Sequence, residues 1–231
     1  MSARFEELDF RSTVLGDLVL IRRRSPSLNG QTVYEVKLDD AFLMSSVVTH
    51  SERALADLPL GVWGDGSCEV LIGGLGLGCT AAAVLRHERV RRVDVVEYLE
   101  PVIDWHRRRL VPDAETLMTD PRCHLIHDDF FRRMASVEPA RRYDLILLDI
   151  DHSPVSWLQE SHQSFYSAEG LQGLVAHLNP GGVFGLWSAE SPPRELLERL
   201  DGCFEVVEEH EIRYHHPMFH EDQSDTVVVA H

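Results

Sequence analysis

A glycine-rich run in the first half of the chain has the composition of a ligand-binding loop. Residues 73–78 read Gly-Gly-Leu-Gly-Leu-Gly and lie between an apolar stretch and a helix-forming stretch. Glycines let the backbone turn tightly and approach a ligand, and the following helix N-terminus presents unpaired N–H groups. The candidate binding residues of this loop are Gly73, Gly74, Gly76 and Gly78.

An acidic residue ends the next apolar stretch. Glu97 follows the glycines by about 20 residues, a spacing at which a carboxylate can accept hydrogen bonds from the ribose hydroxyls of an adenosine ligand. Tyr98 comes directly after it and is a second candidate at this position. Residues 76–81 also fit the dinucleotide pattern G-x-G-x-x-A, so NAD is an alternative ligand.

Further polar residues follow two later apolar stretches. Asp128 and Asp129 come after one of them; Asp149 ends the other, with Asp151 and His152 just beyond it. Carboxylates at the carboxyl ends of parallel strands face the crevice in which open α/β sheets bind ligands. Asp128 and Asp129 are expected at an adenine, and Asp149, Asp151 and His152 at the reacting atoms. A histidine suits a proton transfer there because the ordinary pKa of an imidazole is near neutral. A helix N-cap or a solvent-facing loop is the alternative for these aspartates, above all for Asp129 and Asp151, and an ordinary exposed loop position is the alternative for His152.

The order of the segments predicts the fold that positions these side chains. Apolar strands alternate with helices, and two strands without a helix between them close the chain. The expected strands lie at 69–73, 93–97, 123–126, 144–149, 183–187, 205–214 and 226–230, and the expected helices at 80–87, 101–110, 164–178 and 193–200. This alternation predicts a doubly wound, mostly parallel α/β sheet with an antiparallel edge. A seven-stranded, Rossmann-like sheet of the class I methyltransferase type has this ending.

The first part of the chain has a different texture. Alternating apolar runs at 13–24 and 32–38, joined by turn-forming residues, predict a small β-hairpin unit, and 42–58 is expected to be helical. We therefore divide the chain into a small N-terminal β-strand unit plus helix at 1–60 and a Rossmann-like ligand-binding domain at 61–231.

The composition excludes several classes of function. The chain has 231 residues, 44% of them hydrophobic, and a formal net charge of −16, which disfavours nucleic-acid binding. No apolar run is long enough to span a membrane, and the N-terminus lacks the pattern of a secretory signal. The four scattered cysteines indicate a reducing compartment, and no metal motif is present in the His-rich segment at 213–225, which is expected to be a substrate-facing loop. We expect a cytoplasmic protein that binds no metal.

Five segments carry a family resemblance: V-L-I-G-G at 70–74, V-D-V-V-E at 93–97, D-P-R-C-H-L-I-H-D-D at 120–129, Y-D-L-I-L-L-D at 143–149 and L-N-P-G-G-V-F at 178–184. On these segments the sequence resembles the spermidine synthase (polyamine aminopropyltransferase) family. The resemblance implies that Glu97 holds the ribose, Asp128 the adenine and Asp149 the catalytic position. It also implies a homodimer.

The sequence departs from the pattern of that family at three places. Gly76 stands where the family has a loop aspartate that helps to hold decarboxylated S-adenosylmethionine, and no neighbouring acid replaces it. The second aspartate of the D-S-S-D-P segment is displaced in Asp149-Ile150-Asp151-His152. Leu43, Met44 and Thr49 stand roughly where a glutamine and a tyrosine are expected. Because a polycationic amine needs several carboxylates, these changes argue against polyamine synthesis.

The sequence alone therefore favours methyl transfer from S-adenosylmethionine to a small-molecule acceptor. A loop without the acid suits this donor because an aspartate would repel its methionine carboxylate. The protein would align the acceptor with the methyl group, and Asp149 or His152 would remove a proton. The alternatives are aminopropyl transfer from decarboxylated S-adenosylmethionine to an amine, and a non-catalytic domain that binds an adenosyl ligand or a partner. An NAD-dependent oxidoreductase is less favoured because a second βαβαβ half is missing.

Overall fold

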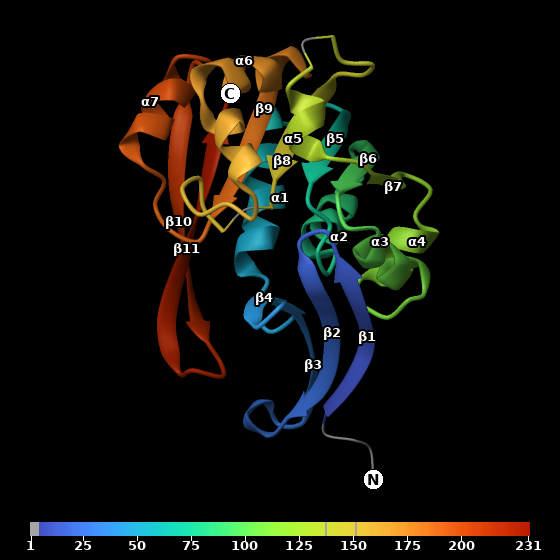
Figure 1. Cartoon of the computed structure of the whole chain (residues 1–231). Helices are drawn as coiled ribbons and strands as arrows, with labels where there is room; N and C mark the ends of the chain where they lie inside the picture. Colours follow the sequence, from blue (N-terminus) through green and yellow to red (C-terminus); the bar gives the residue numbers. More distant parts are fainter. Residues whose placement is uncertain (1–4, 137, 151) are drawn as a thin grey trace.

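The computed structural model describes residues 5–136, 138–150 and 152–231, which form two sheets (Figure 1). The smaller sheet is antiparallel, with the order β1-β2-β3-β4. Its strands are β1 (Phe5–Thr13), β2 (Gly16–Ser25), β3 (Gln31–Leu38) and β4 (Ala41–Ser45). The sequence predicted only the two central strands, so the outer two are corrections.

Each missed strand has a local reason. β1 is largely exposed, so its residues lack the alternation of a half-buried strand. Residues 42–45 were expected to start a helix. A turn at Asp39, which has a φ of 52°, instead reverses the chain so that Met44 pairs with Val36 of β3.

The larger sheet confirms the predicted class of fold. Its order is β10-β11-β9-β8-β5-β6-β7, and the pairs among β5, β6, β7, β8 and β9 are parallel. These strands are β5 (Cys68–Gly73), β6 (Val90–Glu97), β7 (Cys123–His127), β8 (Tyr143–Leu148), β9 (Leu178–Ser188), β10 (Val207–His216) and β11 (Glu221–Ala230). The last two strands form the antiparallel edge. They pair without interruption as far as His216 and Glu221, so 213–225 is mostly hairpin strand and not the loop expected from the sequence.

Helices cover both faces of this sheet. They are α1 (His50–Trp63), α2 (Cys79–Leu85), α3 (Glu100–Arg107), α4 (Ala114–Thr119), α5 (Phe130–Met134), α6 (Ala168–Ala176) and α7 (Arg194–Asp201). The sequence missed the short helices α4 and α5. Short 3-10 helices lie at Pro26–Leu28 and Glu160–Tyr166. Within the described residues, no helix is long and apolar enough to cross a membrane.

Alternation along the parallel strands divides the buried residues between two cores. Val70 and Ile72 of β5 face one core, which also contains residues of α1 to α4 and of the smaller sheet, whereas Leu71 faces the other. Figure 1 shows the smaller sheet beyond the carboxyl ends of the parallel strands, with the β10–β11 hairpin projecting on the same side. Because α1 also packs against β9, β11 and α2, the division of the chain at residue 60 stays a prediction.

Candidate active site

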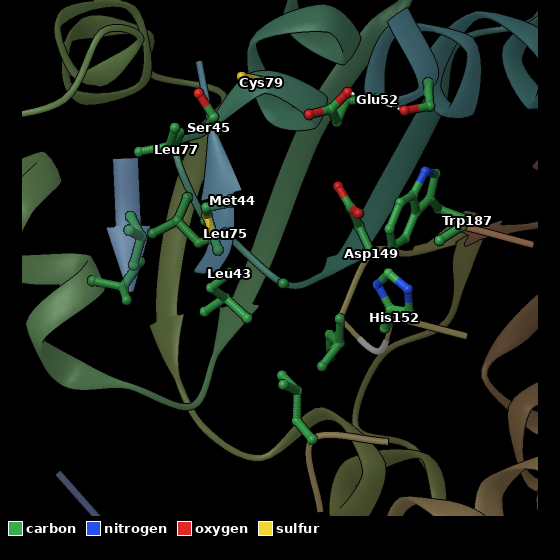
Figure 2. Close-up of a pocket in the computed structure, with 18 of the residues that line it drawn as sticks. Leu43, Met44, Ser45, Glu52, Leu75, Leu77, Cys79, Asp149, His152 and Trp187 are labelled. Carbon is green, nitrogen blue, oxygen red and sulfur yellow. Dashed lines mark hydrogen bonds between the residues drawn. The ribbon is translucent and has the colours of Figure 1, made fainter. Parts of the chain in front are cut away.

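A cavity of about 970 Å³ lies at the carboxyl ends of the parallel strands. Its wall is formed by the loops after β5, β6 and β8, by the start of α1, by β4 and by the β10–β11 hairpin. Figure 2 shows part of this wall, in which the carboxylate of Asp149 points toward Glu52, with Trp187 and His152 beside it. The sheet, the N-terminal strands and the hairpin thus contribute side chains to one site.

The glycine loop allows β5 and β8 to end close together. Gly74 has a φ of +95°, and a Cβ built there would lie 2.1 Å from the backbone oxygen of Asp149. Gly76, with a φ of +48°, also lines the cavity, and the sulfur of Met44 lies 3.0 Å from the position of its missing Cβ. Met44 therefore fills the space beside the loop where a side chain at position 76 would begin.

The other two predicted glycines lie behind the cavity. A Cβ at Gly73 would lie 2.7 Å from the ring of Phe130, and one at Gly78 would lie 2.7 Å from the ring of His106. The Nε2 atom of His106 also lies 3.0 Å from the carbonyl oxygen of Gly76 and supports the loop from beneath. These two glycines shape the loop, whereas Gly74 and Gly76 form its surface.

Glu97 joins the loop to the end of β6. One carboxylate oxygen accepts a hydrogen bond from the backbone N–H of Leu75 at 3.0 Å, and the other accepts one from Leu99 at 2.7 Å. Burial raises the pKa of this carboxyl, and the backbone N–H donors oppose that shift. Both Glu97 and the exposed Tyr98 line the cavity, so the structure brings them together with the glycine loop.

The two aspartates after β7 have different surroundings. Asp128 lies off the cavity wall and pairs with Arg132 at 2.7 Å and Arg133 at 3.1 Å. Burial would raise the pKa of Asp128, but hydrogen bonds from Arg132, the Asp129 backbone and Arg133 lower it. Asp129 lines the cavity, and its side chain caps α5 by accepting from the backbone N–H of Arg132 at 3.0 Å. Of this pair, Asp129 is the residue placed to face a ligand.

Asp149 lies at the centre of the site. Thr80 at the start of α2 donates a hydrogen bond to its Oδ2 atom at 2.6 Å. Burial raises the pKa of Asp149, the Thr80 hydrogen bond lowers it, and the charge of Asp225 raises it. His152 lines the cavity beside the ring of Trp187. Asp151, which was also predicted from the sequence, lies outside the described residues.

Glu52 and Asp225 also line the cavity, and neither was a candidate site residue in the sequence analysis. Glu52 lies in the first turn of α1, and Ser51 donates a hydrogen bond to it at 3.2 Å. Burial raises the pKa of Glu52 to about 8, and the charges of Asp149 and Asp225 raise it as well. Asp225 of β11 accepts a hydrogen bond from the hydroxyl of Tyr214 at 3.2 Å. Glu52 lies between Ser51 and Leu55, which are both buried in α1. Because buried helix faces are normally apolar, a charged residue at this position could have indicated a functional role for Glu52.

The surroundings of these carboxylates suit a cationic ligand. Glu52, Asp149 and Asp225 are close enough for their charges to interact, and such a group favours bound ammonium ions.

The indole nitrogen of Trp187 is buried and has no hydrogen-bond partner among the described residues. Within the same part of the chain, no group of three or more His, Cys, Asp or Glu residues is arranged to hold a metal ion.

Comparisons with known proteins show the family of the chain. The family model of the spermine/spermidine synthase domain matches residues 49–197. The chain is 29% identical over 149 residues to polyamine aminopropyltransferase 2 of Pseudomonas aeruginosa, a match that covers 60% of this chain and 40% of that protein. It is 27% identical over 161 residues to polyamine aminopropyltransferase of Aeropyrum pernix, covering 68% of this chain and 46% of that protein. The chain thus spans about half the length of these curated relatives.

Solved structures show the same fold. A spermidine synthase in complex with the transition-state analogue AdoDATO superimposes with a TM-score of 0.75 at 18% identity, covering 97% of this chain and 73% of that one. Human methyltransferase-like protein 13 in complex with SAH gives a TM-score of 0.54 at 20% identity, covering 78% of each chain. The family model covers well over half of the sequence, and the chain therefore belongs to the spermine/spermidine synthase family.

Proposed function

We propose that this chain transfers an aminopropyl group from decarboxylated S-adenosylmethionine to the nitrogen of a small amine. The observation that carries the proposal is the meeting of Glu52, Asp149 and Asp225 at one cavity. This reaction brings together two cationic nitrogens, one on the donor and one on the acceptor. Carboxylates that face them offset the loss of their hydration.

Methyl transfer, which the sequence alone favoured, receives no support from the curated relatives, since these are polyamine aminopropyltransferases. The cavity gives a physical reason for the difference. Glu52 lies near Cys79, the first residue of α2, where it helps burial to raise the pKa of the Cys79 thiol (Figure 2). An acid from α1 thus stands beside the glycine loop that lacks one. In its ionised form, Glu52 would attract the aminopropyl ammonium and repel the carboxylate of S-adenosylmethionine.

The adenosyl part of the donor fits the other end of the cavity. Gly74 and Gly76 provide a backbone surface, and Glu97, Tyr98 and Asp129 face the same space. We assign the ribose to Glu97 and the adenine to Asp129. Asp128, which was expected at the adenine, is held by two arginines.

Asp149 is the proposed general base. The amine nitrogen attacks the carbon beside the sulfonium; the C–N bond forms as the C–S bond breaks, and the sulfur leaves as the neutral thioether methylthioadenosine. Because an ammonium nitrogen has no lone pair for this attack, it first loses one proton to Asp149, and the hydrogen bond from Thr80 fixes this carboxylate in the cavity. His152 on the same wall is the alternative acceptor of the proton.

The test is calorimetric titration with decarboxylated S-adenosylmethionine and, separately, with S-adenosylmethionine, followed by measurement of methylthioadenosine with a panel of amines. Preferred binding of the decarboxylated donor and amine-dependent methylthioadenosine formation are expected. Tighter binding of S-adenosylmethionine would favour methyl transfer instead. Tight donor binding without turnover of any amine would favour a non-catalytic adenosyl-binding domain. The homodimer and the cytoplasmic location stay predictions.

A further inference from the structure

Part of the cavity is lined by apolar residues of the smaller sheet and the hairpin, with the polar Ser45, His216 and Gln223 among them. It lies between β3 and β4 on one side and the end of the β10–β11 hairpin on the other. Its apolar lining consists of Val36, Phe42, Leu43, Val48, Met218 and Phe219. Phe42 and Phe219 are also exposed, so this wall continues to the cavity mouth. A ligand that extends from the reacting carboxylates toward the mouth therefore passes along an apolar surface.

One carboxylate lies in this apolar part, and it already has a partner. Glu35 of β3 accepts hydrogen bonds from Arg23 at 2.6 and 3.0 Å. The pair is well covered, with 13% of the Glu35 side chain exposed. Arg23 also approaches the sulfur of Met218 at 3.3 Å, which places the pair against the hairpin. Because the guanidinium neutralises Glu35, the carboxylate is not free to hold an ammonium ion.

The remaining carboxylates of the described cavity wall are concentrated elsewhere. Glu97 and Asp129 belong to the adenosyl end, and Glu52, Asp149 and Asp225 surround the reacting centre. An elongated diamine would place its second ammonium among the apolar residues, where no free carboxylate of the described cavity wall compensates for the loss of its hydration. An alkyl or arylalkyl chain in the same place would bury apolar surface favourably.

We propose that the acceptor is a primary amine with one cationic nitrogen and an apolar remainder, and not an extended di- or triamine. This inference rests on the proposed function for its reaction, and it concerns only which amine the cavity takes. The nitrogen lies between Asp149 and Asp225, beside the ring of Trp187, which can contribute a cation–π contact. The apolar remainder lies along β4 and the hairpin.

Pairs of amines with equal numbers of heavy atoms test this directly. Pentylamine is compared with putrescine, and heptylamine with hexamethylenediamine, by calorimetric titration of the protein in the presence of methylthioadenosine. In each pair the monoamine is expected to bind at least about tenfold more tightly. Equal or tighter binding of the diamines would overturn the inference, and so would failure of both monoamines to bind.

An arginine variant makes the test sharper. Arg23→Gln leaves Glu35 without its partner and adds a free carboxylate to the apolar wall. The preference for heptylamine over hexamethylenediamine should then fall several-fold. Arg22→Gln is the matched control, because Arg22 on the same strand pairs with the exposed Glu6 at 2.7 Å and lies off the cavity wall. An unchanged preference in Arg23→Gln, with the protein folded as judged by its melting temperature, would contradict the assignment.

The outcome separates this inference from the proposed function. Amine binding is measured without turnover, so a protein that prefers monoamines but forms no methylthioadenosine keeps the inference and loses aminopropyl transfer. A protein that forms methylthioadenosine mainly with diamines keeps the function and loses the inference.

Discussion

Binding of the donor should release a proton from Glu52. Burial and two neighbouring aspartates raise the pKa of this carboxyl to about 8, so it is largely protonated at neutral pH when the cavity holds no cation. An ammonium group beside it favours the ionised form and lowers the pKa of Glu52 in the complex. Below pH 8, binding of the donor must therefore also remove this proton, which lowers the affinity.

The size of this effect follows from the shift. Each pH unit below the free pKa of about 8 should weaken binding about tenfold, or about 1.4 kcal/mol. Since half of Glu52 is still protonated at a pH equal to its pKa, affinity for decarboxylated S-adenosylmethionine should fall about fiftyfold between about pH 8 and 6, and level off above about pH 9. At neutral pH close to one proton should leave Glu52 for each donor bound.

The assay is calorimetry in buffers with different ionisation enthalpies, with wild type and Glu52→Gln. The variant has no proton to release at this position, so its proton release should fall by about one per donor and its pH dependence should flatten. Glu195→Gln is a matched control, because Glu195 lies in the first turn of α7 but is exposed. Equal proton release in wild type and Glu52→Gln would refute the reasoning, and so would a wild-type affinity that is constant between about pH 6 and 8.

Three further variants test the rest of the site. Asp149→Asn should lower kcat by about 10²- to 10⁴-fold, since the base is lost, while calorimetry shows donor affinity retained; wild-type turnover would exclude Asp149 as base. Thr80→Val removes the hydrogen bond that lowers the pKa of Asp149, so the acid limb of the pH profile of kcat/KM should move to higher pH. An unchanged acid limb would show that the ionisation of Asp149 does not control the rate. Gly74→Ala should destabilise the protein by more than about 3 kcal/mol in urea titrations, because its Cβ would meet the Asp149 carbonyl oxygen. Gly181→Ala, which has positive φ but no neighbour within 4 Å, should cost only about 1 kcal/mol, and equal losses would rule out the steric explanation.

The parallel sheet could be predicted because its signals are local. The apolar run expected at 144–149 forms β8 at Tyr143–Leu148, and the run at 69–73 forms β5 at Cys68–Gly73. Strands buried on both faces have continuous apolar sequences, and the glycines and helices between them mark their ends. β4 had no such signal, because its five residues become a strand through pairing with β3. Their burial depends on a contact that the local pattern does not contain.

The same distinction explains which half of the site could be predicted. Glu97, Asp129 and Asp149 lie at or just beyond the ends of successive parallel strands, so the order of the strands alone brings them to one edge of the sheet. Glu52 and Asp225 come from α1 and the antiparallel hairpin, and they meet Asp149 only through the packing of these elements on the sheet. Absence of an acid from the glycine loop was therefore a poor guide to the charge of the cavity. Because the acceptor end depends on these added elements, substitutions in the hairpin and in β2 or β3 should change the choice of amine while leaving the adenosyl end intact.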